Sequence, residues 1–276
     1  MRELLEVVEG NAAKPAPVVN RQSDNLALVQ LRQFPTGRVI LSPQNKLVCA
    51  TDEGCLAAEK FRFLGIRLRH LQQKRSIKRL LVTSSVAGEG KSTIVANLAC
   101  ALAGGKQKVL LLEGDLRRPS LTQQFGLQSP QGLSELLEGD SAQAANIYRL
   151  ESLGFWFLPA GNAPQNPSEL MQPQKLAALL DELGKVFDWI IIDSPPVLPL
   201  ADTSIWMRLA DAILLVTRPG TTAKRLLQKS LEAIEQSKLL GAVLNGSKEA
   251  TANTYYYNHY SRPLARTEPQ AEKSVS

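Results

Sequence analysis

A glycine-bearing turn between two apolar segments carries the clearest chemical signal in this sequence. Residues 84–93 read Ser-Ser-Val-Ala-Gly-Glu-Gly-Lys-Ser-Thr, after the apolar run 79–83 and before a helical pattern over 93–99. A strand, a tight turn and a helix N-terminus in this order direct unpaired backbone N–H groups at one point, where a phosphate can bind. The segment therefore predicts a phosphate-binding loop, or P-loop.

The residue types within the loop have separate uses. Gly88 and Gly90 let the backbone come close to phosphate oxygens, Lys91 can reach the β- and γ-phosphates, and the Ser92 hydroxyl can ligate Mg²⁺. Ser85 stands where the usual motif has its first glycine. The alternative is a surface loop of the same composition, which the flanking strand and helix disfavour. The residues predicted to contact a nucleotide here are Gly88, Glu89, Gly90, Lys91, Ser92 and Thr93.

A carboxylate closes the apolar run 189–192. Asp193 at this position has the form of a Walker B aspartate, which holds Mg²⁺ beside a bound nucleotide. The alternative is a helix N-cap, but Pro195 and Pro196 follow at once and disfavour an early helical turn. Asp193 is therefore predicted to be a metal-binding residue.

Two more carboxylates follow the apolar run 109–112. Glu113 and Asp115 are two residues apart, and in an extended chain such residues point the same way. Both carboxylates are expected to face one pocket, where one could bind the metal and the other could act as a base. The alternative is a pair of N-caps for a helix after Pro119.

Apolar runs and helical patterns alternate after the P-loop, which predicts an α/β fold with a parallel sheet flanked by helices on both faces. In such a sheet ligands bind at the carboxyl ends of the strands, so the acidic residues and the P-loop should share one crevice. The predicted strands are 79–83, 109–112, 155–158, 188–193, 212–216 and 241–244, and the predicted helices are 56–73, 93–99, 132–137, 173–185 and 222–237.

The composition limits the class of protein. With 276 residues, 44% of them hydrophobic, the chain can form one sizeable domain with tails. Its net charge is +6, with basic residues concentrated over 62–79, but only 5% are aromatic, and nucleic acid is not an expected partner. The three cysteines have no metal-binding spacing. No apolar run of about 18 residues and no signal-peptide pattern occur, so any membrane association is expected to be peripheral or supplied by a partner.

Three regions differ in character. Residues 1–55 are proline-containing without sustained periodicity and predict a poorly ordered arm; residues 56–246 form the predicted P-loop domain; and residues 247–276 form a polar tail. A polar tail cannot bury a cluster of tyrosines, so an exposed set of hydroxyl acceptors is expected there. The clustered tail tyrosines are Tyr255, Tyr256, Tyr257 and Tyr260.

Taken together, the loop at 88–93, the Glu-x-Asp-x-Arg-Arg-Pro segment at 113–119, the Asp-Ser-Pro-Pro segment at 193–196 and the tyrosine-rich tail resemble the bacterial tyrosine kinases (BY-kinases). These enzymes share the MinD/ParA-like P-loop fold, the deviant Walker type of P-loop NTPase. The resemblance implies ATP and Mg²⁺ as cofactors and phosphorylation of the tail tyrosines by a neighbouring subunit of a ring. It assigns catalysis to Lys91, Glu113, Asp115 and Asp193, the metal to Ser92, Asp115 and Asp193, and the surroundings of the nucleotide to Arg218 and Asn245.

The same resemblance implies a biological setting. It predicts a cytoplasmic kinase at the inner face of the membrane, held there by a membrane-embedded polysaccharide co-polymerase that activates it, and a role in capsular or extracellular polysaccharide production. The family's oligomerisation motif, Glu-x-x-Arg-x-x-Arg, is incomplete: Glu59 and Arg62 are present, and Gly65 replaces the second arginine. A homo-oligomer is still expected.

Two alternatives remain open. A switch ATPase of the MinD/ParA kind would hydrolyse ATP to control partner or membrane binding without phosphorylating protein. A scaffold that binds ATP without turnover is the other, because Glu113 stands where the family has Asp, and misplacing a carboxylate by about an ångström can cost about 100-fold in rate.

Overall fold

The computed structural model describes residues 34–39, 45–128, 131–139, 147–198 and 201–247, and the following account is confined to them. Its helices are α2 (Val48–Thr51), α3 (Leu56–Lys74), α4 (Lys91–Ala103), α5 (Leu121–Gln124), α6 (Leu133–Glu138), the 3₁₀ helix η3 (Glu151–Leu153), α7 (Pro167–Leu170), α8 (Pro173–Val186), α9 (Ala201–Leu209) and α10 (Lys224–Ala233). Its strands are β1 (Arg79–Ser84), β2 (Val109–Glu113), β3 (Tyr148–Leu150), β4 (Phe155–Leu158), β5 (Trp189–Asp193), β6 (Ala212–Thr217) and β7 (Leu239–Leu244).

The strands form one seven-stranded sheet in the order β3-β4-β2-β5-β1-β6-β7. All neighbouring pairs are parallel except β3 and β4, which pair antiparallel at one edge. The central strands β1, β2, β5 and β6 are almost wholly buried, as expected for strands covered on both faces. The predicted α/β fold is confirmed, and the short strand β3 is an addition to it.

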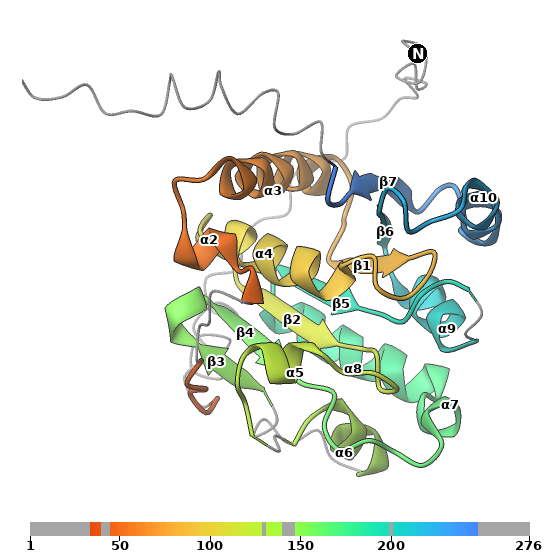
Figure 1. Ribbon diagram of the computed structural model, residues 1–276. Helices are drawn as coiled ribbons and strands as arrows, with labels where there is room; N and C mark the ends of the chain where they lie inside the picture. The colour runs from red at the N-terminus through yellow and green to blue at the C-terminus, as the bar shows by residue number, and fades with distance from the viewer. Residues whose placement is uncertain (1–33, 40–44, 129–130, 140–146, 199–200, 248–276) are drawn as a thin grey trace, which may run out of the picture. The chain divides into compact units, whose positions relative to one another are not determined.

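Helices cover both faces of this sheet (Figure 1). On one face, α3 packs on α4, and α4 packs on the strands through an apolar core that includes Val95, Leu111 and Ile191. On the other face, α8 and α9 contact β5 and β1. Strand β1 lies inside the sheet, between β5 and β6, and the turn that follows it lies at the carboxyl edge. Strands on the two sides of this point are reached by connections that run in opposite directions along the sheet, and ligands commonly bind at such a point.

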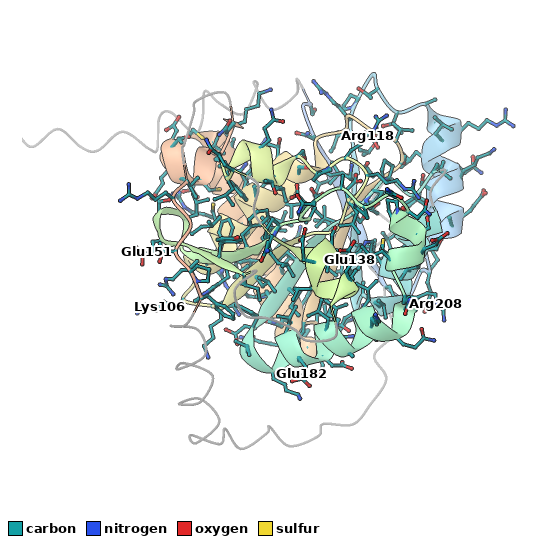
Figure 2. The ribbon with its side chains drawn as sticks, turned by 90° about the horizontal axis from the view of Figure 1, so that it is seen from below. Lys106, Arg118, Glu138, Glu151, Glu182 and Arg208 are labelled. Atoms are coloured by element: carbon teal, nitrogen blue, oxygen red, sulfur yellow. The ribbon has the colours of Figure 1, made fainter. Side chains whose placement is uncertain are left out.

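The sheet is directional, so its two ends carry different residues. Figure 2 shows Lys106, just before β2, and Arg118, just after it, on opposite sides of the domain. The side that carries Arg118 is the carboxyl edge of the parallel strands. Any site formed by strand ends must lie there.

Part of the segment expected to be a poorly ordered arm belongs to the folded unit, which begins at Phe34. Leu47 is fully buried in the core, and Asn97 of α4 donates to the Lys46 carbonyl (2.9 Å) and accepts from the Cys49 N–H (3.1 Å). The boundary at residue 55 is therefore wrong, because contacts distant in sequence recruit residues 34–39 and 45–55. Residues 1–33 and the tail from 248 onward lie outside the described residues.

Within the described ranges, no helix has the length and apolarity needed to cross a membrane.

Candidate active site

The P-loop has the backbone conformation that its glycines were expected to supply. Gly88 and Gly90 adopt φ values of 84° and 89°, in the left-handed region that favours glycine. Gly90 is the residue directly before α4. The first N–H groups of that helix have no partner within the helix and lie beside the loop, where they can bind a ligand. The Lys91 side chain follows and is 9% exposed. The loop and helix therefore form the predicted phosphate-binding turn.

A cavity of about 760 Å³ opens over this loop. Six residues predicted from the sequence line it: Gly88, Gly90, Lys91, Ser92, Thr93 and Asp115. The remaining lining residues are Val86, Ala87, Arg117, Arg118, Ser120, Gln124, Pro196 and Leu198. The crevice thus joins the P-loop to the segments that follow β2 and β5, as the parallel sheet requires.

Asp193 lies at the tip of β5 behind this cavity. Its side chain is buried, and its Oδ1 atom has no hydrogen-bond partner. Burial raises the pKa of Asp193 to about 7, and the positive charge of Lys91 and a hydrogen bond from Ser92 work against that rise. A buried carboxylate oxygen without a donor is costly unless a cation or another ligand satisfies it.

Asp115 lies beyond the tip of β2 and lines the cavity. Its Oδ1 atom accepts a hydrogen bond from the Arg118 N–H (3.0 Å). Burial raises the pKa of Asp115, while this hydrogen bond and the nearby Lys91 charge lower it. Lys91 therefore interacts electrostatically with both predicted metal-binding carboxylates, and the cavity brings Asp115 and Ser92 together.

These residues fit a nucleotide with bound magnesium. The unpartnered Asp193 oxygen offers a ligand position, and the left-handed glycines leave room for phosphate oxygens beside the backbone. Among the residues that the structure describes, no three His, Cys, Asp or Glu side chains form a metal cluster. Mg²⁺ does not need one, because it commonly binds through one or two carboxylates together with substrate phosphates and water.

Glu113 departs from its predicted place. It is fully buried, it does not line the cavity, and its carboxylate accepts four hydrogen bonds from Leu121, Thr122 and Ala160. The expectation that Glu113 and Asp115 face one pocket is wrong for Glu113. Strand β2 ends at Glu113, so the alternation that placed the two carboxylates on one side does not continue through Gly114 to Asp115.

Three other predicted residues lie behind the P-loop. Glu89 is fully buried and accepts hydrogen bonds from the backbone N–H groups of Val86 (2.9 Å) and Arg218 (3.2 Å) and from the hydroxyl of Thr222. Asn245 donates through its Nδ2 atom to the Glu89 carbonyl (2.8 Å). Glu89, Arg218 and Asn245 are not among the residues that line the cavity, and these hydrogen bonds connect them to the P-loop. Their contact with a nucleotide stays a prediction.

Two cavity residues, Ser120 and Gln124, were not assigned from the sequence. The Ser120 hydroxyl donates to the Ser92 hydroxyl (2.8 Å), and Gln124 lies one turn along in α5. A helix that starts shortly after the tip of a strand must lie at the same edge of the sheet. That rule, applied to the chain after Pro119, would have identified both residues.

The predicted oligomer residues lie on α3. Glu59 and Arg62 form an ion pair within the helix, and Arg62 also donates to the Glu53 carbonyl (2.7 Å). Their role between subunits stays a prediction. The predicted acceptors Tyr255, Tyr256, Tyr257 and Tyr260 lie outside the described residues.

Relatives of known name share most of this chain. A family profile described as "ParA: NUBPL iron-transfer P-loop NTPase" matches residues 76–260. The tyrosine-protein kinase YwqD of Bacillus subtilis is 34% identical over 78% of this chain and 91% of its own length. The putative tyrosine-protein kinase CapB of Staphylococcus aureus is 33% identical over 72% and 89%. The chain spans only 30% of the longer putative tyrosine-protein kinase AmsA of Erwinia amylovora.

Solved structures that are similar to this chain include a bacterial tyrosine kinase domain. The kinase domain of the Escherichia coli tyrosine kinase ETK superposes with a TM-score of 0.69 at 30% identity, over 72% of this chain and 79% of that domain. The chimerical protein CapA2B2 gives 0.67 at 32% identity, over 80% and 97%. The more distant MinD of Pyrococcus horikoshii, complexed with Mg-ADP, gives 0.51 at 26% identity, over 64% and 76%.

These likenesses favour the kinase over the switch ATPase. Each of the three relatives above is named as a tyrosine-protein kinase or a putative one, whereas the MinD structure matches less of this chain and at a lower score. Neighbours that bind a nucleotide with magnesium support the same kind of ligand for this fold. The chain belongs to the bacterial tyrosine-protein kinases, a family built on the ParA-type P-loop NTPase domain.

Proposed function

We propose that this chain is an ATP-dependent protein-tyrosine autokinase that phosphorylates its own tail at Tyr255, Tyr256, Tyr257 and Tyr260. The observation that carries the proposal is the junction of three features at one edge of the sheet: the P-loop cavity, Asp115 in its wall, and the unpartnered oxygen of Asp193 behind it. This arrangement supports phosphate binding together with a magnesium ion.

The residues have distinct roles in this proposal. Lys91 neutralises charge on the β- and γ-phosphates, and Ser92, Asp115 and Asp193 hold the magnesium ion. The bound magnesium supplies further charge neutralisation on the phosphates. In the transfer, the bond from the γ-phosphorus to the ADP oxygen breaks, a bond to the tyrosine oxygen forms, and the phenolic proton passes to a carboxylate at the strand tips.

The proposed acceptor tyrosines follow the P-loop domain after a short connecting segment. The ten residues from Asn245 to Tyr255 span about 33–36 Å when extended. Each phosphate adds about −1.5 to −2 charge to the tail. We therefore include both intramolecular and intersubunit transfer in the proposal.

The partner and the process are further parts of this proposal. One relative is named for its place in a cps region of Klebsiella pneumoniae, and one solved neighbour is a CapA2B2 chimera. In keeping with these names, we propose that a membrane-embedded activator recruits this kinase to the inner face of the membrane. The process would be capsular or extracellular polysaccharide production.

The test is phosphotyrosine mapping by mass spectrometry on the full chain incubated with ATP and Mg²⁺, with and without the activator's cytoplasmic segment. We expect phosphate on the four tail tyrosines, its loss in Lys91→Met, and its persistence in the control Lys185→Met, an exposed lysine on α8. The absence of phosphotyrosine from the wild type under all conditions would contradict the proposal.

Deleting residues 247–276 separates the kinase from the switch ATPase. We expect the deletion to remove most phosphate incorporation while ATP binding is unchanged. A protein that keeps an ATP-dependent partner interaction without the tail, and never forms phosphotyrosine with it, would be a switch.

A further inference from the structure

The Glu113 carboxylate has no free acceptor position. Its Oε1 atom accepts from the N–H groups of Leu121 (2.6 Å) and Thr122 (3.3 Å). Its Oε2 atom accepts from the Thr122 hydroxyl (2.6 Å) and the Ala160 N–H (3.2 Å). A carboxylate offers about four lone-pair positions, so all are used.

The four donors come from two places far apart in the sequence. Leu121 and Thr122 begin α5, whose first N–H groups have no partner within the helix. Ala160 follows β4, 47 residues after Glu113. Glu113 therefore joins the tip of β2, the start of α5 and the segment after β4.

Helix α5 forms part of the wall of the nucleotide cavity. Ser120, directly before it, donates to the proposed magnesium ligand Ser92 (2.8 Å). Gln124, at its end, lines the cavity and exchanges hydrogen bonds with Asn45 (2.6 and 2.7 Å). A shift of α5 would thus move two side chains that border the nucleotide.

We propose that Glu113 is a positioning residue that fixes α5 against the P-loop, and that it does not accept the tyrosine proton. Asp115 is the carboxylate of this segment that lines the cavity, and its proposed role as a magnesium ligand is unchanged. The second half of this inference rests on the proposed kinase function, whereas the first concerns nucleotide binding alone.

The extra methylene of glutamate suits this role. It carries the carboxylate about an ångström farther than aspartate would, toward the N–H groups of α5. Glu113→Asp should therefore pull the carboxylate away from Leu121 and Thr122. If Glu113 were instead the base, Glu113→Asp should raise kcat, because the resembled family carries aspartate at this position.

The matched control is Glu135, a second carboxylate at a helix start, which does not line the cavity. It accepts from the N–H groups of Gly132 (2.6 Å), directly before α6, and of Asn162 (3.0 Å), in the segment after β4. Glu135→Gln tests the loss of such a cap without touching α5. We expect it to lower the melting temperature and to leave the affinity for ATP unchanged.

The experiment measures the Kd for Mg-ATP by calorimetry, KM and kcat for phosphotyrosine formation, and the melting temperature. The variants are Glu113→Gln, Glu113→Asp, Thr122→Val and the Glu135→Gln control. We expect each α5-side variant to raise Kd and KM by about 3- to 30-fold with kcat within about fivefold of wild type. Combining Glu113→Gln with Thr122→Val should add little, because both act on the same contact.

Three results would overturn the proposal. A kcat reduced about 100-fold or more in Glu113→Gln with Kd unchanged would make Glu113 the base. A kcat raised in Glu113→Asp would do the same. A lower melting temperature with unchanged Kd, as in the Glu135 control, would leave Glu113 with a purely structural role. The Kd values test the positioning role even if the wild type forms no phosphotyrosine. Failure of the kinase proposal can therefore be distinguished from failure of this one.

Discussion

Two acidic side chains at neighbouring strand tips, Glu113 on β2 and Asp193 on β5, are paired in register yet bonded in opposite ways. Both are buried, and both lie on the sheet face that α4 covers, since Leu111 and Ile191 two residues earlier pack in that core. Glu113 accepts four hydrogen bonds, whereas one oxygen of Asp193 has no partner.

This difference indicates that Glu113 stabilises the fold, whereas Asp193 belongs to a ligand site. Burying an unpaired carboxylate oxygen costs free energy, so its retention indicates a group that joins it during function. A saturated carboxylate is already part of the fold, and removing it loosens whatever its donors hold. Two buried acidic side chains at adjacent positions therefore do not need to have the same role.

The largest predicted effect is that of Asp193→Asn. We expect at least a 100-fold loss of phosphotyrosine formation, because a magnesium ligand is removed. We also expect the nucleotide-free protein to gain about 1–3 kcal/mol in free energy of unfolding, since a buried, incompletely paired charge becomes neutral. Urea unfolding in EDTA at pH 8 measures the second effect. A destabilised variant would contradict the view of Asp193 as an unsatisfied group.

A smaller effect is expected from Gly90→Ala in the P-loop. A side chain here meets the positive φ of 89° and the Nδ2 atom of Asn245. We expect a loss of about 1–3 kcal/mol in stability and at least tenfold weaker ATP binding. The control is Gly184→Ala in α8, where the nearest side-chain atom is 4.0 Å away and alanine favours the helix by about 0.5–1 kcal/mol. Equal outcomes at both glycines would refute the strained-loop account.

The smallest effect concerns Cys49, beside a second cavity of about 420 Å³ remote from the P-loop. Burial raises the pKa of Cys49 to about 12, so its reactive thiolate is scarce at pH 8. We expect alkylation roughly a thousandfold slower than that of the unfolded chain, rising about tenfold per pH unit, and changed less than twofold by Mg-ATP. Mass spectrometry in a Cys55→Ser background measures it. Strong protection by Mg-ATP would link the two cavities.

Strands and helices with a clear hydrophobic pattern of their own were predicted correctly from the sequence. The runs at 109–112 and 155–158 and the helical spacing over 56–73 correspond to β2, β4 and α3, with limits that differ by a residue or less. Strand β3 was missed because three residues of an edge strand carry little periodicity. The helix expected over 222–237 is shorter, Lys224–Ala233, since the chain leaves the helix before β7.

The site was predicted less completely than the fold. Lys91, Ser92 and Asp115 come together as the motif implies, because a strand, a turn and a helix position them locally. The orientation of Glu113 was not predictable, since its donors include Ala160, brought near only by the pairing of β4 with β2. Leu47 joined the core for the same reason: its neighbours are distant in sequence.

The most direct test is the effect of Mg²⁺ on ATP affinity, measured by calorimetry with the metal and with EDTA in the wild type, Asp193→Asn and Glu113→Gln. We predict that magnesium tightens binding in the wild type and in Glu113→Gln, and that this gain disappears in Asp193→Asn. A gain that survives in Asp193→Asn, or disappears in Glu113→Gln, would contradict the roles assigned to the two strand tips.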